Sequence, residues 1–516
     1  MSARDRFEFL VGNPAAGSDF GRKTVRSGAY ALAGEGVDFF IRLASVVILA
    51  RLLLPEHFGL IAMVTAVTMI AERFKDLGLT AAAIQSPTLS HEQASTLFWV
   101  NVGAGWLMAG CVAGLAYPLV LFYDDPRLFH ITLAIALTFL WSGFASQHYA
   151  LLRRAMKYRE IAVIQVAASV LSVIVAVAMA MNGFGYWALV GREVARSIFL
   201  SVGAWIFLPW IPGGLCLRSG VGRMLKFGAD ITAFNFVFLV AQSIDQLLVG
   251  KVLGAHALGV YRQGYQLVLA PMNQLAYPVR VVMESALSRL QHDAEAYRHY
   301  YRYMLTVVAF VTFPLGLFMA TYSKELVTVL LGPAWLEAIP VFRILAIAAT
   351  LYPAGVTAGA VMVTCGLSRR LFWIGLASAV VLVALLVAGL PFGVVGIASA
   401  HLVATWVFLI PKLYWSFHGT PISVRLFLIA IARPAAAAVF MVIILVAWKI
   451  TTGATPGLAT LAAGLLVGVV SYAAAWFIIP GGRAELYEIY DRIAARLGLQ
   501  KYVPAWALRI IRGRSV

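Results

Sequence analysis

The chain alternates between long apolar runs and short polar or basic clusters along almost its whole length. The runs extend over about 18 residues or more and are apolar on all sides, whereas a helix in a soluble core is apolar on one face only. This pattern predicts an all-α membrane protein with about fourteen transmembrane helices. The predicted spans are residues 27–54, 57–85, 95–123, 128–150, 160–182, 186–210, 226–252, 257–284, 303–322, 338–364, 371–390, 394–416, 426–448 and 457–479.

Composition and charge agree with this class. Of the 516 residues, 61% are hydrophobic and 12% are charged, against about 25% charged in soluble domains. The net charge of +17 comes from basic residues in alternate loops, as in the cluster 153–159 (RRAMKYR), whereas the acidic turn 124–126 (DDP) falls on the other side. With the N-terminus taken as cytoplasmic, most of the basic residues fall on the inner side, as the positive-inside rule requires, and fourteen spans leave the C-terminus in the cytoplasm as well. Topology accounts for the basicity, so no nucleic-acid partner is expected.

The two ends of the chain are polar. Residues 1–24 lack the apolar region of a cleaved signal peptide and are expected to form a cytoplasmic segment. Residues 481–516 read as a basic amphipathic helix on the inner surface, with a frayed basic tail as the alternative. The three cysteines, Cys111, Cys216 and Cys365, are scattered and indicate neither a disulfide framework nor a metal site.

A weak internal repeat appears when the chain is shifted by about 200 residues, because Gly28 then falls on Gly228 and Gly59 on Gly259. Two hundred residues hold six predicted helices, so both copies have the same orientation in the membrane. Parallel repeats are typical of two lobes related by an axis along the membrane normal. The expected division is an N-lobe over 25–217, a C-lobe over 218–418 and two further helices over 419–480.

Polar side chains form a stripe on the first span of each predicted lobe. Glu35, Asp38 and Arg42 project within an arc of about 60° on an α-helix. The corresponding helix of the second lobe carries three more polar residues, Asn235, Gln242 and Asp245. Charged groups in a membrane cost a few kcal/mol and normally face a cavity or a partner.

Two interpretations of these stripes remain open. The charges on the first span can neutralise one another by i+3 and i+4 pairing and hold helices together. Alternatively they line a hydrated cavity, with the polar groups binding substrate and Glu35, Asp38 or Asp245 taking up a coupling H+ or Na+.

Further arginines lie inside predicted spans. Arg192 and Arg196 are one turn apart on one face, and guanidinium groups match phosphate oxygens bidentately while staying charged. Arg262 lies between Tyr261 and Tyr265 in a polar, aromatic stretch that suits a phosphate and a sugar. Alternatively Arg262 reaches out to the lipid headgroups.

No catalytic pattern accompanies these residues. The chain has no Walker-type glycine loop, no His-Glu-x-x-His and no paired Asp-rich motif. No loop is long enough to fold into an extramembrane domain. The sequence therefore predicts a protein that is not an enzyme and that needs no metal or cofactor.

Several short motifs resemble those of Wzx-type polysaccharide flippases, the polysaccharide transporter branch of the multidrug/oligosaccharidyl-lipid/polysaccharide exporter superfamily. The resemblance covers about residues 25–416, and its motifs occur in the family's order and spacing. One departure is Glu284-Ser285, where the family often has a proline before this run, which puts the kink and gating of that helix in doubt. The matching segments are 50–59 (ARLLLPEHFG), 78–85 (GLTAAAIQ), 245–254 (DQLLVGKVLG), 258–261 (LGVY), 287–290 (LSRL), 331–335 (LGPAW) and 340–345 (PVFRIL).

The resemblance implies a flippase that moves a polyprenyl-diphosphate-linked oligosaccharide from the cytoplasmic to the periplasmic leaflet by alternating access. It also implies a location in the bacterial inner membrane and a role in exopolysaccharide, capsule or O-antigen assembly. The further partners it implies are membrane lipids, a polysaccharide polymerase and glycosyltransferases. Rival interpretations are a lipid II flippase and a cation-coupled small-molecule antiporter of the same superfamily. A rival from another class is a membrane glycosyltransferase or ligase of the pathway.

Overall fold

The computed structural model describes residues 20–74, 80, 83–84, 86, 89–216, 222–453 and 455–487, with the side chains of 20–23, 25, 70, 73–74 and 222–243 excepted. All regular secondary structure in these ranges is helical. The chain folds as two compact units, residues 1–259 and 260–516, and each is described by itself. The predicted lobe boundary at 217/218 stays a prediction.

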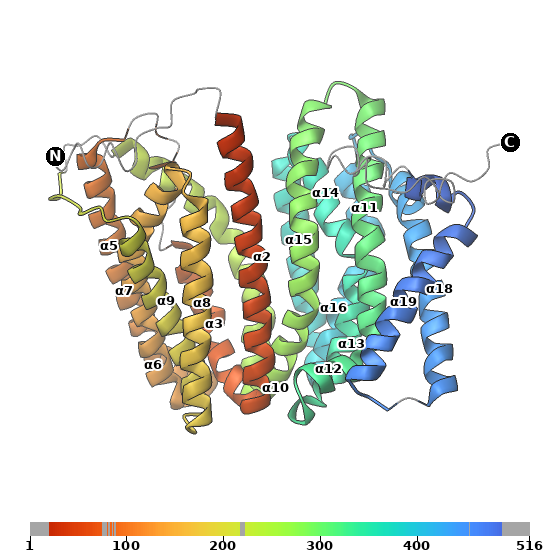
Figure 1. The fold of residues 1–516 in the computed structure, drawn as a ribbon, viewed down its shortest axis with the longest axis horizontal. Coiled ribbons are helices and arrows are strands. Elements are labelled where there is room, and N and C mark those ends of the chain that lie inside the picture. Colours follow the sequence, from red (N-terminus) through yellow and green to blue (C-terminus); the bar gives the residue numbers. More distant parts are fainter. Residues whose placement is uncertain are drawn as a thin grey trace. The chain divides into compact units, whose positions relative to one another are not determined.

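The first unit is a bundle in which α8 packs along α2 and α9, and α7 packs along α5 and α9. Figure 1 shows these helices in red to yellow, running side by side. The elements are α2 (Phe20–Leu52), α3 (Pro55–Phe74), α5 (His91–Gly114), α6 (Ala116–Tyr123), α7 (Arg127–Arg154), α8 (Tyr158–Met181), α9 (Trp187–Phe207) and the first part of α10 (Gly222–Arg289).

The long α10 is two helices joined at Gly254, whose φ of 82° lies in the left-handed region that favours glycine. The break falls between the predicted spans 226–252 and 257–284. The first part of α10 belongs to the first unit, and the second unit begins at Val260.

A close crossing within the first unit joins α3 to residues 255–259 of α10, directly after the break. A Cβ on Gly59 would lie 1.7 Å from the carbonyl oxygen of Ala255, and one on Gly259 would lie 1.9 Å from that of Pro55. Under the 200-residue offset Gly59 corresponds to Gly259 and Pro55 to Ala255, so the two contacts are equivalent to each other. Glycine is required at both positions because any side chain would overlap backbone.

Ion pairs lie at the same end of the first unit. Lys251 Nζ is 2.7 Å from Asp124 Oδ2, and Arg127 Nη2 is 2.7 Å from Glu56 Oε1. Arg127 also donates hydrogen bonds to Asp125, and these lower the pKa of the Asp125 carboxyl, which lies in the turn between α6 and α7. These contacts tie that turn to α3 and α10.

The second unit is built around α11, which packs along α18 and α13. Its elements are the second part of α10, α11 (Ala294–Thr321), α12 (Ser323–Leu330), η1 (Pro333–Trp335), α13 (Ala338–Ala349), α14 (Tyr352–Thr364), α15 (Ser368–Gly389), η2 (Leu390–Phe392), α16 (Gly393–Val407), α17 (Leu409–Phe417), α18 (Val424–Thr452) and α19 (Leu458–Ile478).

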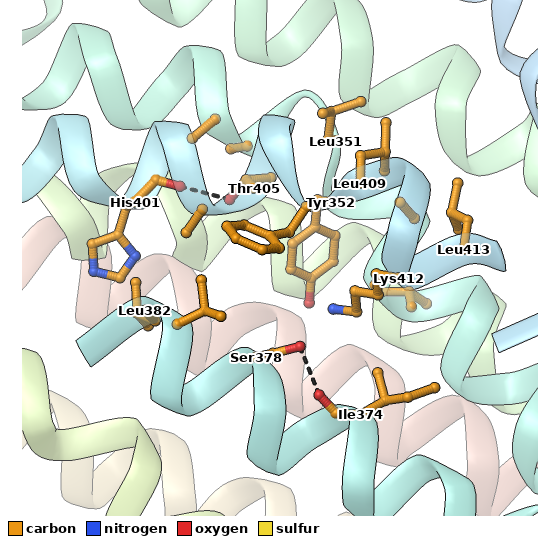
Figure 2. Close-up of a pocket in the computed structure, with 18 of the residues that line it drawn as sticks. Leu351, Tyr352, Ile374, Ser378, Leu382, His401, Thr405, Leu409, Lys412 and Leu413 are labelled. Carbon is orange, nitrogen blue, oxygen red and sulfur yellow. Dashed lines mark hydrogen bonds between the residues drawn. The ribbon is translucent and has the colours of Figure 1, made fainter. Parts of the chain in front are cut away.

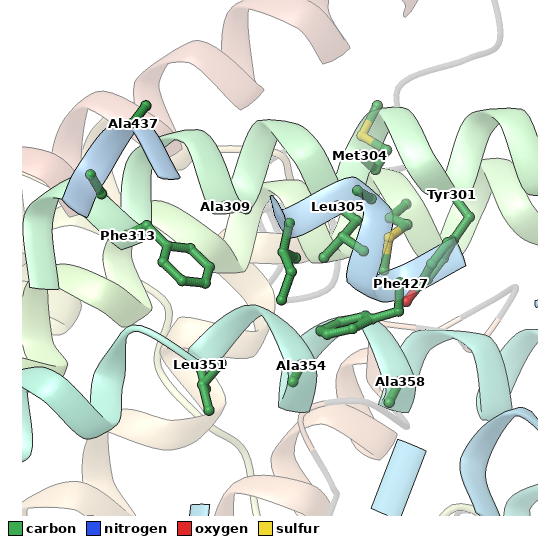
Figure 3. Packing of buried hydrophobic residues seen from close by; sticks show 14 of the residues in the cluster. Tyr301, Met304, Leu305, Ala309, Phe313, Leu351, Ala354, Ala358, Phe427 and Ala437 are labelled. Atoms are coloured by element: carbon green, nitrogen blue, oxygen red, sulfur yellow. The ribbon is translucent and has the colours of Figure 1, made fainter. Parts of the chain in front are cut away.

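The core of this unit lies between α11, α14 and α18. Figure 3 shows Leu305 and Phe313 of α11 above Ala354 of α14, with Phe427 of α18 closing the cluster. Small residues on α14 let the helices approach closely. The buried Tyr301 hydroxyl forms a hydrogen bond with the Thr357 hydroxyl at 3.2 Å. Helices α18 and α19, which fall outside the sequence repeat, therefore pack into the body of this unit.

Seven helical segments of the described chain are long and apolar enough to cross a membrane, and the bent pair α13–α14 makes an eighth. Helices α2 and α9 have 33 and 21 residues but are interrupted by the charged residues described below. A bend of 41° divides the predicted span 338–364 between α13 and α14, and Pro353 lies in the first turn of the second helix. The protein is thus a multi-pass helical membrane protein.

The described part of the C-terminal tail is anchored to the second unit. Glu485 Oε1 lies 2.9 Å from Arg302 Nη2 of α11 and 2.7 Å from Arg433 Nη1 of α18. Leu486 packs against the core beside it. The remainder of the predicted amphipathic helix, from residue 488, and most of the N-terminal segment lie outside the described residues.

Replacing Glu485 by Gln is expected to release this tail, because a neutral amide holds two guanidinium groups much less strongly than a carboxylate does. Limited proteolysis of the purified protein should then cleave the tail several times faster. The matched control is Glu337→Gln, a substitution of the same kind at the start of α13, away from the tail. Equal cleavage of both variants and the parent protein would show that Glu485 does not anchor it.

Candidate functional site

A buried carboxylate joins three helices of the first unit. Asp38 of α2 is 3% exposed, and its Oδ2 lies 3.1 Å from Arg42 Nε and 3.6 Å from Arg196 Nη2 of α9. Ser169 of α8 donates a hydrogen bond to Asp38 Oδ1 and accepts one from Arg196 Nε at 3.4 Å. Asp38 thus orients both guanidinium groups, so the pairing interpretation describes this part of the stripe.

The remaining polar groups of α2 and α9 lie near this cluster along the chain. Arg192 Nη1 donates to Ser45 Oγ at 3.5 Å, and its Nη2 lies 2.7 Å from Glu193 Oε1. Glu35 is exposed on α2. The structure therefore brings Arg42, Arg192 and Arg196 together around α2, while Glu35 stays on the surface of the unit.

The predicted residues of α10 are placed only in part. Asp245 is buried, and its Oδ1 accepts a hydrogen bond from the backbone N–H of Gln246 at 2.8 Å. The side chains of Asn235 and Gln242 lie outside the described residues.

Arg196 also lines a polar pocket of about 380 Å³ within the first unit. The pocket lies between α3, α7, α8 and α9, and most of its polar groups are hydroxyls, amides and charges. The polar residues that line it are Thr65, Thr68, Glu72, Thr80, Thr138, Ser142, Ser146, Tyr149, Arg153, Gln165, Glu193, Arg196 and Ser197.

Helix α7 supplies one wall of this pocket, with Thr138, Ser142, Ser146, Tyr149 and Arg153. These five positions fall within an arc of about 80° on an α-helix. Such a polar stripe through an apolar helix is readable from the sequence, but the sequence analysis did not single it out. The sequence analysis also did not single out Gln165 and Ser169 of α8, although they lie one turn apart on one face of that helix.

Tyr149 presents a buried hydroxyl that has no hydrogen-bond partner among the described residues. A buried hydroxyl without a partner is costly, so this group is suited to bind a polar ligand in the pocket. Sugars offer many hydroxyls, and Arg153 and Arg196 provide positive charge for phosphate.

Replacing Tyr149 by Phe is expected to weaken substrate binding by roughly three- to tenfold, the effect of one neutral hydrogen bond. Since the hydroxyl has no partner among the described residues, stability should not fall. The apparent KM in a transport assay and the Tm of the purified variant measure the two effects. Tyr123→Phe is the matched control, since that buried hydroxyl also lacks a described partner but lies outside the pocket; an equal change in both variants contradicts the prediction.

The aromatic residues predicted around Arg262 lie in the second unit. Tyr261 Oη is 2.7 Å from His401 Nε2 of α16, and the rings of Tyr265 and His401 are 5.8 Å apart. Arg262 is half-buried beside them in the chain. The sequence does not indicate this contact, because Tyr261 and His401 are 140 residues apart. Within the described ranges, no three His, Cys, Asp or Glu side chains are grouped to hold a metal ion.

The helical fold resembles that of known transporters. The solved structure of the lipid II flippase MurJ, in its inward closed conformation, superposes with a TM-score of 0.69 and 13% identity, covering 89% of this chain and 98% of that one. At this identity the likeness concerns the fold alone.

Comparison of the sequence with known families identifies the family of this chain. The family described as "Polysaccharide biosynthesis protein" matches residues 48–340, more than half of the chain. The protein belongs to this family.

Two curated relatives illustrate this membership. The lipopolysaccharide biosynthesis protein WzxC of Escherichia coli is 25% identical over 66% of this chain and 70% of its own. The succinoglycan biosynthesis transport protein ExoT of Rhizobium meliloti is 23% identical over 69% and 73%. Membership, a multi-pass helical fold and a role in polysaccharide biosynthesis agree with the resemblance found in the sequence.

Proposed function

We propose that this protein flips a polyprenyl-diphosphate-linked oligosaccharide from the cytoplasmic to the periplasmic leaflet by alternating access. The product feeds exopolysaccharide, capsule or O-antigen assembly, with glycosyltransferases acting before transfer and a polymerase acting after it. The family and the names of its relatives support this class of substrate. The single observation that carries the proposal is the polar pocket beside the Asp38–Arg42–Arg196 cluster.

The chemistry of the pocket suits such a substrate. Arg196 and Arg153 attract the diphosphate, while the hydroxyls of α7 and the amide of Gln165 match sugar hydroxyls. Asp38 holds Arg42 and Arg196 in place, and the 54% exposed Arg42 side chain remains open to a ligand. Arg262, Tyr261 and Tyr265 are the candidates for phosphate and sugar contacts in the second unit. Asn235 and Gln242, on the first part of α10, are further candidates in the first unit.

Coupling to an H+ or Na+ gradient belongs to the same proposal. The candidate groups are Glu35, Asp38 and Asp245. Asp38 is already paired with two arginines, so a change in its protonation would loosen α9 from α2. We propose a cytoplasmic location for both termini and an inner-membrane location for the protein.

The deciding experiment reconstitutes the purified full chain in liposomes with a fluorescent polyprenyl-diphosphate oligosaccharide. Transfer is measured as loss of accessibility to an impermeant quencher. The proposal predicts protein-dependent transfer of this lipid and little transfer of lipid II. Transfer of lipid II alone favours the second candidate, a lipid II flippase, which the likeness to MurJ motivates. Transfer of neither lipid contradicts both.

A further inference from the structure

A second cavity, of about 710 Å³, lies within the second unit between α10, α14, α15, α16 and α17. Figure 2 shows Leu382 and Leu409 on its apolar walls, with Tyr352, Ser378 and Lys412 as the polar groups of one region. We call this cavity the apolar chamber. Its size is that of a typical pocket for a small amphipathic ligand.

The charged side chains that line the apolar chamber are all basic. Lys412 and Arg280 line it, and none of its described lining residues is Asp or Glu. Arg280 has a carboxylate within reach, because its Nε is 3.6 Å from Glu284 Oε1. Lys412 forms no ion pair with any described residue. A half-buried ammonium among apolar walls favours an anionic partner.

A more open cavity continues the apolar chamber toward the end where α15 begins and α17 ends. The two cavities share Ile374 and Trp415. The outer one carries Arg369, Arg370 and His418, again without an acidic lining residue among those described. Trp373 and Trp415 are 56% and 58% exposed beside these groups. Arginines with exposed tryptophans are typical of the depth of lipid headgroups.

We propose that the apolar chamber binds the isoprenoid end of a single-chain lipid phosphate. The first isoprene units lie against α14, α15 and α16, and the phosphate accepts a hydrogen bond from Lys412 on the side where the chamber opens toward Arg369. The enclosed volume suits part of one chain rather than the two chains of a glycerophospholipid. The identity of the lipid as a polyprenyl phosphate rests on the proposed function.

This site is separate from the polar pocket of the first unit. The polar pocket contains hydroxyls and amides for sugars, whereas the apolar chamber contains leucine, alanine and valine with one ammonium. The two cavities therefore suit different chemistry, sugars and diphosphate in the polar pocket and an isoprenoid chain with one phosphate in the apolar chamber.

The test measures binding of undecaprenyl phosphate to the purified full chain in detergent by native mass spectrometry. Lys412→Met is expected to weaken this binding about tenfold, because a charge-assisted hydrogen bond is lost. Lys412→Arg should retain most of the binding. Ala404→Phe, which fills the chamber without touching the charge, should weaken it as well. Lys324→Met on α12 is the matched control and should bind like the parent protein.

Three further ligands test whether the isoprenoid chain and the phosphate are both needed for binding. Undecaprenol lacks the phosphate and should bind weakly and equally to the parent and to Lys412→Met. Phosphatidylglycerol and inorganic phosphate should compete poorly. Equal binding of phosphatidylglycerol, strong competition by inorganic phosphate, or unchanged undecaprenyl phosphate binding in both Lys412→Met and Ala404→Phe overturns the inference.

These outcomes are distinguishable from a failure of the proposed function. If the protein binds undecaprenyl phosphate through Lys412 but transfers no lipid-linked oligosaccharide, the proposed lipid site is supported and the proposed flippase function is contradicted. If the protein transfers the oligosaccharide but binds undecaprenyl phosphate independently of Lys412 and of Ala404, the flippase function is supported and the lipid site is contradicted.

Discussion

Replacing Arg196 by Glu is expected to reduce transfer of the lipid-linked oligosaccharide by roughly 100-fold, because a charge-assisted contact to diphosphate contributes about 1.5–3 kcal/mol and is here replaced by repulsion. The change also places a second carboxylate close to Asp38, whose Oδ2 now lies 3.6 Å from Arg196 Nη2. Transfer per folded protein in the liposome assay measures the effect.

Two controls separate charge from folding. Arg425→Glu makes the same change at an exposed residue of α18 and should transfer normally. Arg196→Lys keeps the charge but loses the planar fork, so an intermediate rate is expected. A folded Arg196→Glu variant that transfers at the parent rate would remove Arg196 from the substrate site.

The cluster around Asp38 and Arg196 shows how much of the site can be predicted from the sequence of one helix. The spacing of Glu35, Asp38 and Arg42 predicts one polar stripe on α2, and the structure pairs Asp38 with Arg42 as that spacing allows. The stripe does not show which helices approach it. Ser169 and Arg196 come from α8 and α9, and only packing brings them to Asp38.

The limits of hydropathy appear at the helix breaks. A window of about 19 residues averages over a break, so the predicted spans do not reveal the bend before Pro353 or the step between α16 and α17 at Phe408. The break at Gly254 is different. It falls in a predicted loop, because Lys251 and Gly254 interrupt the apolar run.

The polar pocket and the apolar chamber differ in how visible they are in the sequence. The α7 stripe from Thr138 to Arg153 repeats with helical spacing and is detectable in principle. Lys412 is a single charge near the end of a predicted span, where long basic side chains commonly reach the headgroups. Its significance depends on the walls that α14, α15 and α16 build around it, and these come together only in the folded chain.

Gly59→Leu is expected to have the largest effect on stability. A Cβ at this position would lie 1.7 Å from the carbonyl oxygen of Ala255, so α3 and α10 must separate and lose their packing along the crossing. Substitutions of this kind belong to the class that costs more than about 4 kcal/mol. We expect little folded protein in the membrane and a strongly lowered Tm, measured by fluorescence-detected size-exclusion chromatography after heating.

The reciprocal geometry makes the prediction specific. Gly259→Leu meets the carbonyl of Pro55 at 1.9 Å and should fail to the same degree, whereas Gly103→Leu on α5, where a Cβ meets nothing within 4 Å, should be tolerated. If the crossing of α3 and α10 forms in one state of the transport cycle only, the Gly59→Leu and Gly259→Leu variants fold but remain in the other state. Cysteine accessibility of α3 then changes while the Tm does not. A folded Gly59→Leu variant with unchanged accessibility and transfer contradicts the crossing itself.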